Sequence, residues 1–462
     1  MGISMDKIVN HCKTRGFVFP GSDIYGGLAN SWDYGPLGVE LKNNIKQAWW
    51  KKFVTSRLDM VGLDAALLMN PKVWEASGHV ATFSDPLVEC RKCHARFRAD
   101  DASQSFKVEF NAKDLPRPED LNQSVAYRIS GNCPNCGALA ADTFTDPSSF
   151  NLMLKTFLGP KEDASATVYF RPETAQAMFV DFQLVQTSSR KRIPFGIAQI
   201  GKAFRNEITP GNFIFRQREF EQMEIEYFIH PKDWEKHFEL WLTAMHEWTE
   251  ECGITQSAVH DLEVPVDELA HYSKRTVDIE YDFPFGKKEL YGLAYRTDFD
   301  LTNHGQASGK EITYTDPDTN EKYVPHVIEP SFGVDRTFLA ILTSAYQEEA
   351  VEEDVRIVLR LPKHLAPIKV AILPLSKKDE LAQVAYPLAE QLAKRWRVDY
   401  DETQSIGKRY RRQDEIGTPL CVTVDFETLA DQAVTVRDRD TMQQERVPLA
   451  ELEAYLSKQL GG

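Results

Sequence analysis

The stretch from Phe204 to Phe220, FRNEITPGNFIFRQREF, constrains the fold of this chain more than any other feature. Two short runs of Arg, Glu and Phe flank the turn-forming residues Thr-Pro-Gly-Asn, which predicts two strands joined by a loop. The strand period of two then places one set of side chains on a single face: Arg216, Arg218, Phe220, Gln222 and Glu224. Burying these charged side chains under an apolar core would cost free energy, but the same face suits a ligand with phosphate, a flat ring and an amine.

Two other interpretations of this region are open from the residues alone. A surface hairpin whose charges pair across its strands is the usual fate of such residues. The preceding GIAQIGKA, Gly196 to Ala203, has the glycine and lysine spacing of a phosphate-binding P-loop. That loop needs a Ser or Thr hydroxyl where Ala203 stands, and a helix where the chain continues as strand, so we interpret the match as accidental.

The strand FRNE, followed by a loop and by Arg216 with Phe220 four positions on, resembles the second motif of the class II aminoacyl-tRNA synthetases. PSFGVDRTFLAIL, from Pro330, resembles the third motif. The amphipathic helix from Gly38 to Arg57, with the apolar strand that ends at Pro71, resembles the first, which forms the dimer interface in that class. The segments GGLANSWDYGPLG, FRAD, RPETAQ, YRTDFDL and EPSFGVDR are similar to the homodimeric glycyl-tRNA synthetases, and this resemblance covers nearly the whole chain.

The resemblance implies an α+β fold in three parts. Residues 1–86 and 158–360 form a class II catalytic domain, an antiparallel sheet flanked by helices; residues 87–157 form an inserted, zinc-ribbon-like Cys-rich segment. Residues 361–462 form an α/β anticodon-binding domain, which begins at the proline-containing linker LPKHLAP. A length of 462 residues independently favours two or three domains.

The implied function is a ligase that activates glycine with ATP to glycyl-adenylate and transfers glycine to the 3′ end of its tRNA. Its partners are glycine, the tRNA for glycine and a second copy of the chain, with no membrane. Two alternatives remain: a class II ligase for another amino acid such as proline or threonine, and a non-catalytic nucleic-acid-binding relative.

For ATP, the resemblance implies three catalytic arginines. Arg205 meets the α-phosphate, Arg216 meets the γ-phosphate, and Arg336 stacks on the adenine opposite Phe220. A guanidinium stays charged and grips phosphate oxygens in a fixed geometry, which suits these tasks. The implied ATP site comprises Arg205, Asn206, Glu207, Phe215, Arg216, Gln217, Arg218, Glu219, Phe220, Glu289, Leu290, Gly333, Val334, Asp335 and Arg336, with Mg²⁺ near the Glu289 carboxylate.

Glycine has no side chain to recognise, so its site must hold the ammonium group with carboxylates and fill the space of a methyl group. The resemblance implies a glycine site of Arg98, Glu173, Phe220, Glu221, Gln222, Met223, Glu224, Glu329, Pro330, Ser331, Phe332 and Gly333. For Glu173 alone, a carboxylate that simply begins a helix beside Pro172 is the plainer alternative.

Four of the seven cysteines form two close pairs, CRKC and CPNC followed by Gly137. A gap of two residues lets a turn direct two thiolates at one metal ion, so Cys90, Cys93, Cys133 and Cys136 are predicted ligands of a structural Zn²⁺. His94 is interpreted as a neighbour. Four buried or free thiols are the alternative.

The net charge of −15 opposes broad attraction to nucleic acid, although it permits a local basic patch. The clusters SSRKR and GKRYRR are such patches, and solvated surface is the plainer interpretation of each. The resemblance makes Lys408, Arg409, Arg411 and Arg412 candidate contacts to the anticodon stem. We see no secretory signal and no apolar run of membrane-spanning length, and we expect a cytoplasmic protein.

Overall fold

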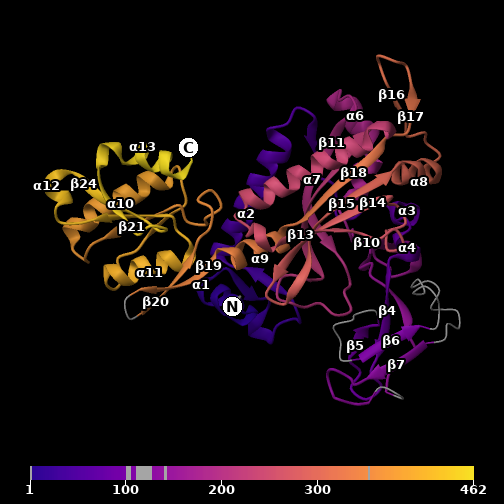
Figure 1. Ribbon diagram of the computed structural model, residues 1–462, viewed down its shortest axis with the longest axis horizontal. Helices are drawn as coiled ribbons and strands as arrows, with labels where there is room; N and C mark the ends of the chain where they lie inside the picture. Colours follow the sequence, from indigo (N-terminus) through magenta and orange to yellow (C-terminus); the bar gives the residue numbers. More distant parts are fainter. Residues whose placement is uncertain (1–2, 100–105, 111–126, 140–142, 352–353, 462) are drawn as a thin grey trace.

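The structure, a computed structural model, describes residues 3–99, 106–110, 127–139, 143–351 and 354–461 (Figure 1). A large sheet with its helices lies in the middle of the molecule. The C-terminal α/β unit lies on one side of it, and the Cys-rich part projects on the other. Within the inserted segment, residues 100–105, 111–126 and 140–142 fall outside the described residues.

A seven-stranded sheet in the order β13-β14-β15-β18-β12-β11-β3 forms the centre. All neighbouring strands are antiparallel except β11 and β3, which are parallel. The strands are β3 (Met60–Gly62), β11 (Phe195–Phe204), β12 (Glu219–Ile229), β13 (Val259–Glu263), β14 (Arg275–Phe283), β15 (Gly286–Thr297) and β18 (His326–Gly333). The expected antiparallel sheet of the catalytic core is therefore present.

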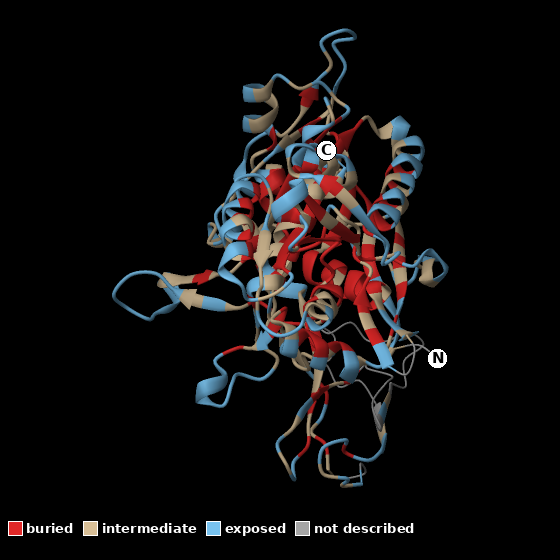
Figure 2. Cartoon of the chain, turned by 90° about the vertical axis from the view of Figure 1, so that its left-hand side faces the viewer, coloured by how far each residue is buried: buried red, intermediate tan, exposed pale blue. Residues whose placement is uncertain are grey.

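Helices pack on one face of this sheet. They are α1 (Met5–Arg15), α2 (Pro36–Trp50), which continues as a π-helical turn over Lys51–Thr55, α7 (Trp234–Glu251) and α9 (Val334–Ala345). The predicted stripe of α2 is buried: its Trp49 ring lies 5.8 Å from that of Phe332, and the Phe53 ring lies 5.4 Å from it. The buried centre of Figure 2 lies between these helices and the sheet.

The opposite face of the sheet is only partly covered. Three helices, α5 (Ala175–Val180), α6 (Phe182–Ser189) and α8 (Phe299–Ser308), pack at one end of the strands, where Phe179 and Phe182 meet Phe228. Two short helices, α3 (Pro71–Ala76) and α4 (His79–Thr82), come before these three helices in the sequence. The other end of β12 on this face is left for a cavity.

Two predicted strands are shorter than expected. The strand before Pro71 is limited to Met60–Gly62, because beyond it Ala65 donates its backbone N–H to the buried Gln199 side chain instead of a neighbouring strand. The second strand of the opening stretch begins at Glu219. Residues 212–215 form a turn whose Phe213 and Ile214 are buried in the core, so Arg216 and Arg218 precede the regular strand.

The P-loop alternative is excluded, because β11 runs through it as an unbroken strand. Gly201 has a structural reason of its own. A Cβ there would lie 2.1 Å from the Arg171 guanidinium, which is buried and bonds the backbone oxygens of Lys202 and Ala65.

The Cys-rich part is built from small sheets. Its three-stranded sheet, in the order β5-β4-β8, comprises β4 (Ser84–Glu89), β5 (Arg96–Arg98) and β8 (Ser148–Asn151). A separate antiparallel pair is formed by β6 (Phe106–Phe110) and β7 (Tyr127–Gly131). Three further strand pairs decorate the core: β1 (Val18–Pro20) with β2 (Trp32–Tyr34), β9 (Lys155–Phe157) with β10 (Thr167–Tyr169), and β16 (Tyr314–Thr315) with β17 (Lys322–Tyr323).

The C-terminal unit follows a hairpin of β19 (Tyr346–Val351) and β20 (Asp354–Leu359). Its sheet, in the order β22-β21-β23-β24-β25, comprises β21 (Val370–Pro374), β22 (Val398–Tyr400), β23 (Leu420–Val424), β24 (Ala433–Asp438) and β25 (Gln444–Pro448). Its helices are α10 (Asp379–Ala393), α11 (Ile406–Ile416), α12 (Thr428–Asp431) and α13 (Leu449–Leu460). An α/β unit was expected here, but α11 was not.

Helix α11 ties the C-terminal unit to the rest of the chain. Its buried Asp414 accepts from Arg356 of β20 at 2.8 Å and from Arg437 of β24 at 2.8 Å. The next residue, Glu415, accepts at its carbonyl from His11 Nε2 of α1, at 2.8 Å. Among the described residues, no helix is both long and apolar enough to cross a membrane.

Candidate active site

The uncovered end of the sheet holds a cavity of about 520 Å³. Its floor is the face of β12 that carries Phe220, Gln222 and Glu224, with the adjoining residues of β15 and β18. Eighteen of the predicted site residues line it: Arg98, Glu173, Arg205, Glu207, Phe215, Arg216, Gln217, Phe220, Glu221, Gln222, Glu224, Glu289, Leu290, Glu329, Ser331, Gly333, Asp335 and Arg336.

The three predicted arginines reach this cavity from different elements. Arg205 follows β11 and donates from Nε to the Pro172 carbonyl at 3.0 Å, with its guanidinium 5.3 Å from the Phe220 ring centre. Arg216 lies in the loop before β12, 3.9 Å from the Glu207 carboxylate. These contacts hold one planar cation beside an aromatic ring and a second beside a carboxylate, an arrangement that can bind a nucleotide.

Arg336 comes from the first turn of α9 and lies at the far wall. Its guanidinium stands 4.5 Å from the centre of the Phe215 ring and donates to the Glu289 carboxylate at 3.1 Å. Arg336 is the main cause of a lowered pKa at Glu289. On the same wall, burial together with Glu289 and Glu280 raises the pKa of Asp278 to about 7.

Carboxylates gather at the other end of the cavity. Glu224 accepts from the Ser331 hydroxyl at 2.8 Å and from the Thr174 hydroxyl, while Glu329 accepts from Arg296 Nη1 at 2.8 Å. Burial opposes ionisation of Glu173, but His79 and Arg296 outweigh it and lower the pKa of that carboxyl. Burial and the charge of Glu173 raise the pKa of Glu224. The group can therefore hold a cation.

The residues that organise this carboxylate end were not among those predicted from the sequence. Arg296 is 2% exposed, lies 3.8 Å from the centre of the Tyr272 ring, and pairs with Asp300 at 2.8 Å. Gln176 donates to both Glu173 and Asp300. The available signal was the segment YRTDFDL, in which Arg296 and Asp300 are four residues apart, but nothing in the local pattern says that both are buried.

Seven predicted residues do not line the cavity. Met223 and Phe332 point into the core on the other face of the sheet, because side chains alternate along a strand, and Val334, the first residue of α9, is buried in the same core. Arg218 and Glu219 line a second cavity of about 300 Å³ beside the first. Pro330 is buried opposite Leu293 of β15, and Asn206 donates its backbone N–H to the Leu152 carbonyl.

Asp335 of the third motif lines both cavities, yet its carboxylate is occupied by the protein itself. It accepts from the Tyr34 hydroxyl, from Lys42 Nζ of α2 at 2.9 Å and from the Glu221 backbone N–H at 2.8 Å. Lys42 and Asp335 are both buried. This residue therefore fastens α9 to α2 and to the cavity floor.

Comparisons with known proteins place the chain in a family. The description "tRNA synthetase class II core domain (G, H, P, S and T)" matches residues 160–345, and "Anticodon binding domain" matches residues 369–459. The chain is 55% identical over 460 residues to the Glycine–tRNA ligase of Alkaliphilus oremlandii (strain OhILAs), across 99% of this chain and 98% of that protein. The chain belongs to the glycine–tRNA ligase family.

Other relatives agree with this assignment. The Glycine–tRNA ligase of Bacillus anthracis is 54% identical over 461 residues, across 99% of each chain. A solved structure of prolyl-tRNA synthetase from Cryptosporidium parvum, complexed with L-proline and AMP, shares the fold with a TM-score of 0.63 at 14% identity. That match covers 99% of this chain and 75% of the other.

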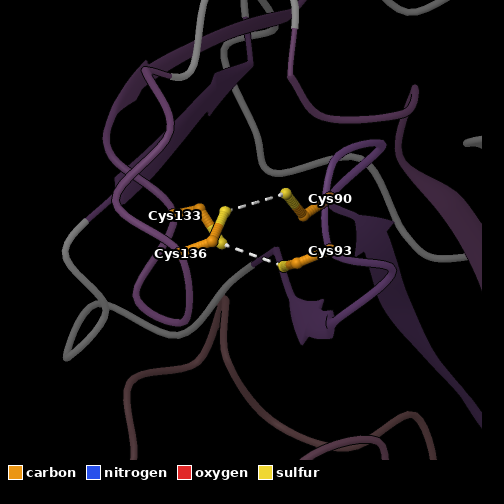
Figure 3. A group of neighbouring side chains, drawn as sticks. All are labelled: Cys90, Cys93, Cys133 and Cys136. Carbon is orange, nitrogen blue, oxygen red and sulfur yellow. Dashed lines mark hydrogen bonds between the residues drawn. The ribbon is translucent and has the colours of Figure 1, made fainter.

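This member of the glycine–tRNA ligase family also brings its two cysteine pairs together (Figure 3). The Sγ atoms of Cys90, Cys93, Cys133 and Cys136 all lie within 4.8 Å of one another. Two of the distances, Cys90 to Cys136 and Cys93 to Cys133, are 3.8 and 3.7 Å. Four thiolates around one Zn²⁺ at about 2.3 Å stand about 3.8 Å apart, so the cluster fits a tetrahedral zinc site. His94 bonds Glu89 instead.

The expected anticodon contacts fall on α11 and are not equivalent. Lys408 is exposed, and Arg411 and Arg412 are partly exposed. Arg409 is 1% exposed and donates to the carbonyls of Pro374, Asp401 and Leu375, so its guanidinium is used to hold the fold. The prediction for Arg409 is therefore wrong, because the sequence could not show which face of α11 is buried.

Proposed function

We propose that the chain is a glycine–tRNA ligase that joins glycine to ATP as glycyl-adenylate, releases pyrophosphate, and passes glycine to the 3′ end of its tRNA. The observation that carries the proposal is one cavity with arginines and aromatic rings at one end and carboxylates at the other. A nucleotide and an amino acid fit such a cavity end to end. The relatives named above support the choice of glycine.

In the first step, the glycine carboxylate attacks the α-phosphorus of ATP. Both groups are anions, so the protein must align them and stabilise the charge that develops on the phosphate. We assign Arg205 to the α-phosphate and Arg216 to the γ-phosphate. Arg336 holds the adenine against Phe220, with the Phe215 ring behind its guanidinium.

Mg²⁺ fits beside Glu289, because a second carboxyl, Asp278, lines the same wall and the two charges interact. Oxygen ligands of this kind are those that Mg²⁺ prefers, together with phosphate oxygens. When bound, the ion would offset the charge of the triphosphate.

At the other end, Glu173, Glu224 and Glu329 bind the glycine ammonium, and Ser331 orients Glu224. A larger amino acid would have to place its side chain among buried charged groups that are already paired with Arg296 and Gln176. In the second step a hydroxyl of the terminal ribose of the tRNA attacks the adenylate carbonyl, and the adenylate phosphate accepts its proton. No side-chain nucleophile is required.

The remaining assignments concern the whole chain. We assign the catalytic domain to residues 1–86 and 158–360, the inserted segment to 87–157 and the anticodon-binding domain to 361–462. Lys408, Arg411 and Arg412 contact the tRNA, Zn²⁺ binds the four clustered cysteines as a structural ion, and two chains form a dimer through the first motif. None of the seven cysteines, all of which are described, forms a disulfide, which supports a reducing compartment such as the cytoplasm.

Amino-acid-dependent pyrophosphate exchange tests the proposal. Glycine should stimulate exchange of labelled pyrophosphate into ATP, whereas proline and threonine should not. Stimulation by another amino acid would assign a different ligase, and failure of every amino acid together with failure to bind ATP would leave a non-catalytic relative. Light scattering on the eluted peak of a sizing column tests the dimer.

A further inference from the structure

Beneath the carboxylate end of the cavity lies one more acidic side chain, Glu226 of β12. It shares the strand face of Glu224 but sits two residues deeper, and it is fully buried. Neither of its carboxyl oxygens has a hydrogen-bond partner among the described residues. A buried carboxylate without partners is strongly unfavourable, so this group needs either a proton or a cation.

The register of the sheet places Glu226 against Glu329. Glu224 pairs with Ser331, and Tyr227 pairs with Ile328, so Glu226 comes opposite Glu329 of β18 on the same face. Glu329 is itself buried and lines the cavity. Two carboxyl groups that face each other out of water cannot both ionise at little cost.

Positive charge at this place is scarce. Arg296 of β15 faces the pair, but its guanidinium donates twice to Asp300 of α8 and only once to Glu329. The other charged or titratable groups around the pair are Glu224 of β12, Glu173 before α5, His79 of α4, Tyr272 before β14 and His304 of α8. Carboxyl groups thus outnumber the arginine.

We propose that one carboxyl of the facing pair Glu226 and Glu329 is protonated while the amino-acid site is empty, and that the glycine ammonium displaces that proton to solvent. The step balances: one ammonium enters the buried cluster and one proton leaves it, so the charge of the cluster does not change. Glu226 acts through Glu329 and is a positioning residue. This inference rests on the proposed glycine site.

The electrostatics of the pair agree with this step. Burial and the facing carboxyl raise the pKa of Glu226, and burial with the nearby Glu224 raises the pKa of Glu329 despite Arg296. An ammonium group beside Glu329 favours its ionised form and lowers that pKa again. Binding should therefore weaken as the pH falls, because the proton then becomes harder to remove.

Calorimetric titration tests the proposal on the intact chain. The probe is the non-hydrolysable sulfamoyl analogue of glycyl-adenylate, which carries the same ammonium group, titrated near neutral pH in PIPES, HEPES and Tris. The slope of the observed enthalpy against the ionisation enthalpy of the buffer counts the protons released. We expect a substantial fraction of a proton, up to about one per ligand.

Two variants locate the proton. Glu226→Gln keeps the shape but leaves Glu329 without a facing carboxyl, so it should release less than half of the wild-type amount and bind at least as tightly. Glu226→Leu serves the same purpose if the amide variant does not fold. Glu162→Gln, at an exposed carboxylate on the loop between β9 and β10, should match the wild type.

The outcomes are distinct. An enthalpy that does not depend on the buffer in the wild-type protein, or an undiminished proton release in both Glu226 variants, would overturn the proposal. Absence of any binding by the wild-type protein would instead count against the glycine site itself.

Discussion

At the scale of single residues, the cavity depends on side chains that the backbone holds in place before any ligand arrives. Arg205 is an example, because the Pro172 carbonyl fixes its Nε and leaves the end of the fork to a ligand. Hydrogen-bond donors that are already in position stabilise a transition state most where charge develops during the reaction.

We therefore predict that Arg205→Ala lowers the rate of glycine-dependent pyrophosphate exchange by about 10²–10³-fold. Arg205→Lys should recover little, since an ammonium cannot reproduce the fork. Arg218→Ala provides the comparison, because Arg218 lines the second cavity and should cost less than about tenfold. Equal losses for Arg205→Ala and Arg218→Ala would contradict this division of roles.

Asp335 should matter more for stability than for contact with a ligand. Asp335→Ala would remove the nearer of the two carboxylates that pair with the buried Lys42, at 2.9 Å, and would leave Glu221 at 3.1 Å, so we expect a loss of about 1–3 kcal/mol in the free energy of unfolding. Urea unfolding measures it. The double variant with Lys42→Met should be more stable than Asp335→Ala alone; if it is less stable, the buried pair is not the cause.

The residues of the cavity could be found from the sequence only where a motif contains them. Arg205, Arg216 and Arg336 belong to such motifs and all line the cavity. Arg296 and Glu226 were missed, since a charged residue in a strand looks the same whether it is solvated or buried. Arg218 was misplaced because it lies in a bend just before the regular strand, which begins at Glu219, so strand alternation does not apply to it.

At the scale of elements, the Cys-rich part forms a wall of the cavity. The knuckle with Cys90 and Cys93 is the turn between β4 and β5. These two strands carry Asp85 and Arg98, which line the cavity and pair at 2.9 Å. A metal at the knuckle would therefore stabilise the hairpin that presents both side chains.

We predict about one zinc ion per chain, measured by atomic emission on protein purified without added metal. Cys93→Ser should lose most of the ion and lower the melting temperature. Cys252→Ala removes a buried thiol outside the cluster, and should keep the ion. Metal-free protein whose four cluster thiols react without any change in melting would refute the site.

Prediction of elements succeeded where apolar periodicity is strong and failed where it is weak. The stripe of α2 is apolar and buried, as expected. The buried face of α11 is polar, made of Arg409, Gln413 and Asp414, so no periodicity of apolar residues marks it as a helix. Its partners lie far away in sequence, in β20 and β24, which only the folded chain reveals.

At the scale of the whole molecule, α1 packs against α11 through His11. Burial lowers the pKa of His11 from 6.5 to about 4, although the bond to the Glu415 carbonyl works against that change. Between pH 6.5 and about 4, His11 therefore binds a proton in the unfolded chain but not in the folded one. Its contribution to the free energy of unfolding is complete above pH 6.5 and decreases as the pH falls toward 4.

We predict that His11→Gln, which keeps a donor for the same carbonyl, flattens the loss of unfolding free energy between those two pH values by up to about 3 kcal/mol. Denaturant unfolding at a series of pH values compares the variant with the wild type. Parallel curves for wild type and His11→Gln would refute the assignment.

The contacts of α1 give the first turns of the polypeptide a role at its opposite end. His11 and Arg15 both hold Glu415, and Arg356 holds the adjoining Asp414. Replacing His11 and Arg15 with side chains that cannot reach Glu415 would keep every side chain of the nucleotide cavity, and would also keep Ile8 and Cys12 of α1 in the core. It would nevertheless free one flank of the helix that offers Lys408 and Arg411, so these two replacements should weaken RNA binding while sparing adenylate formation.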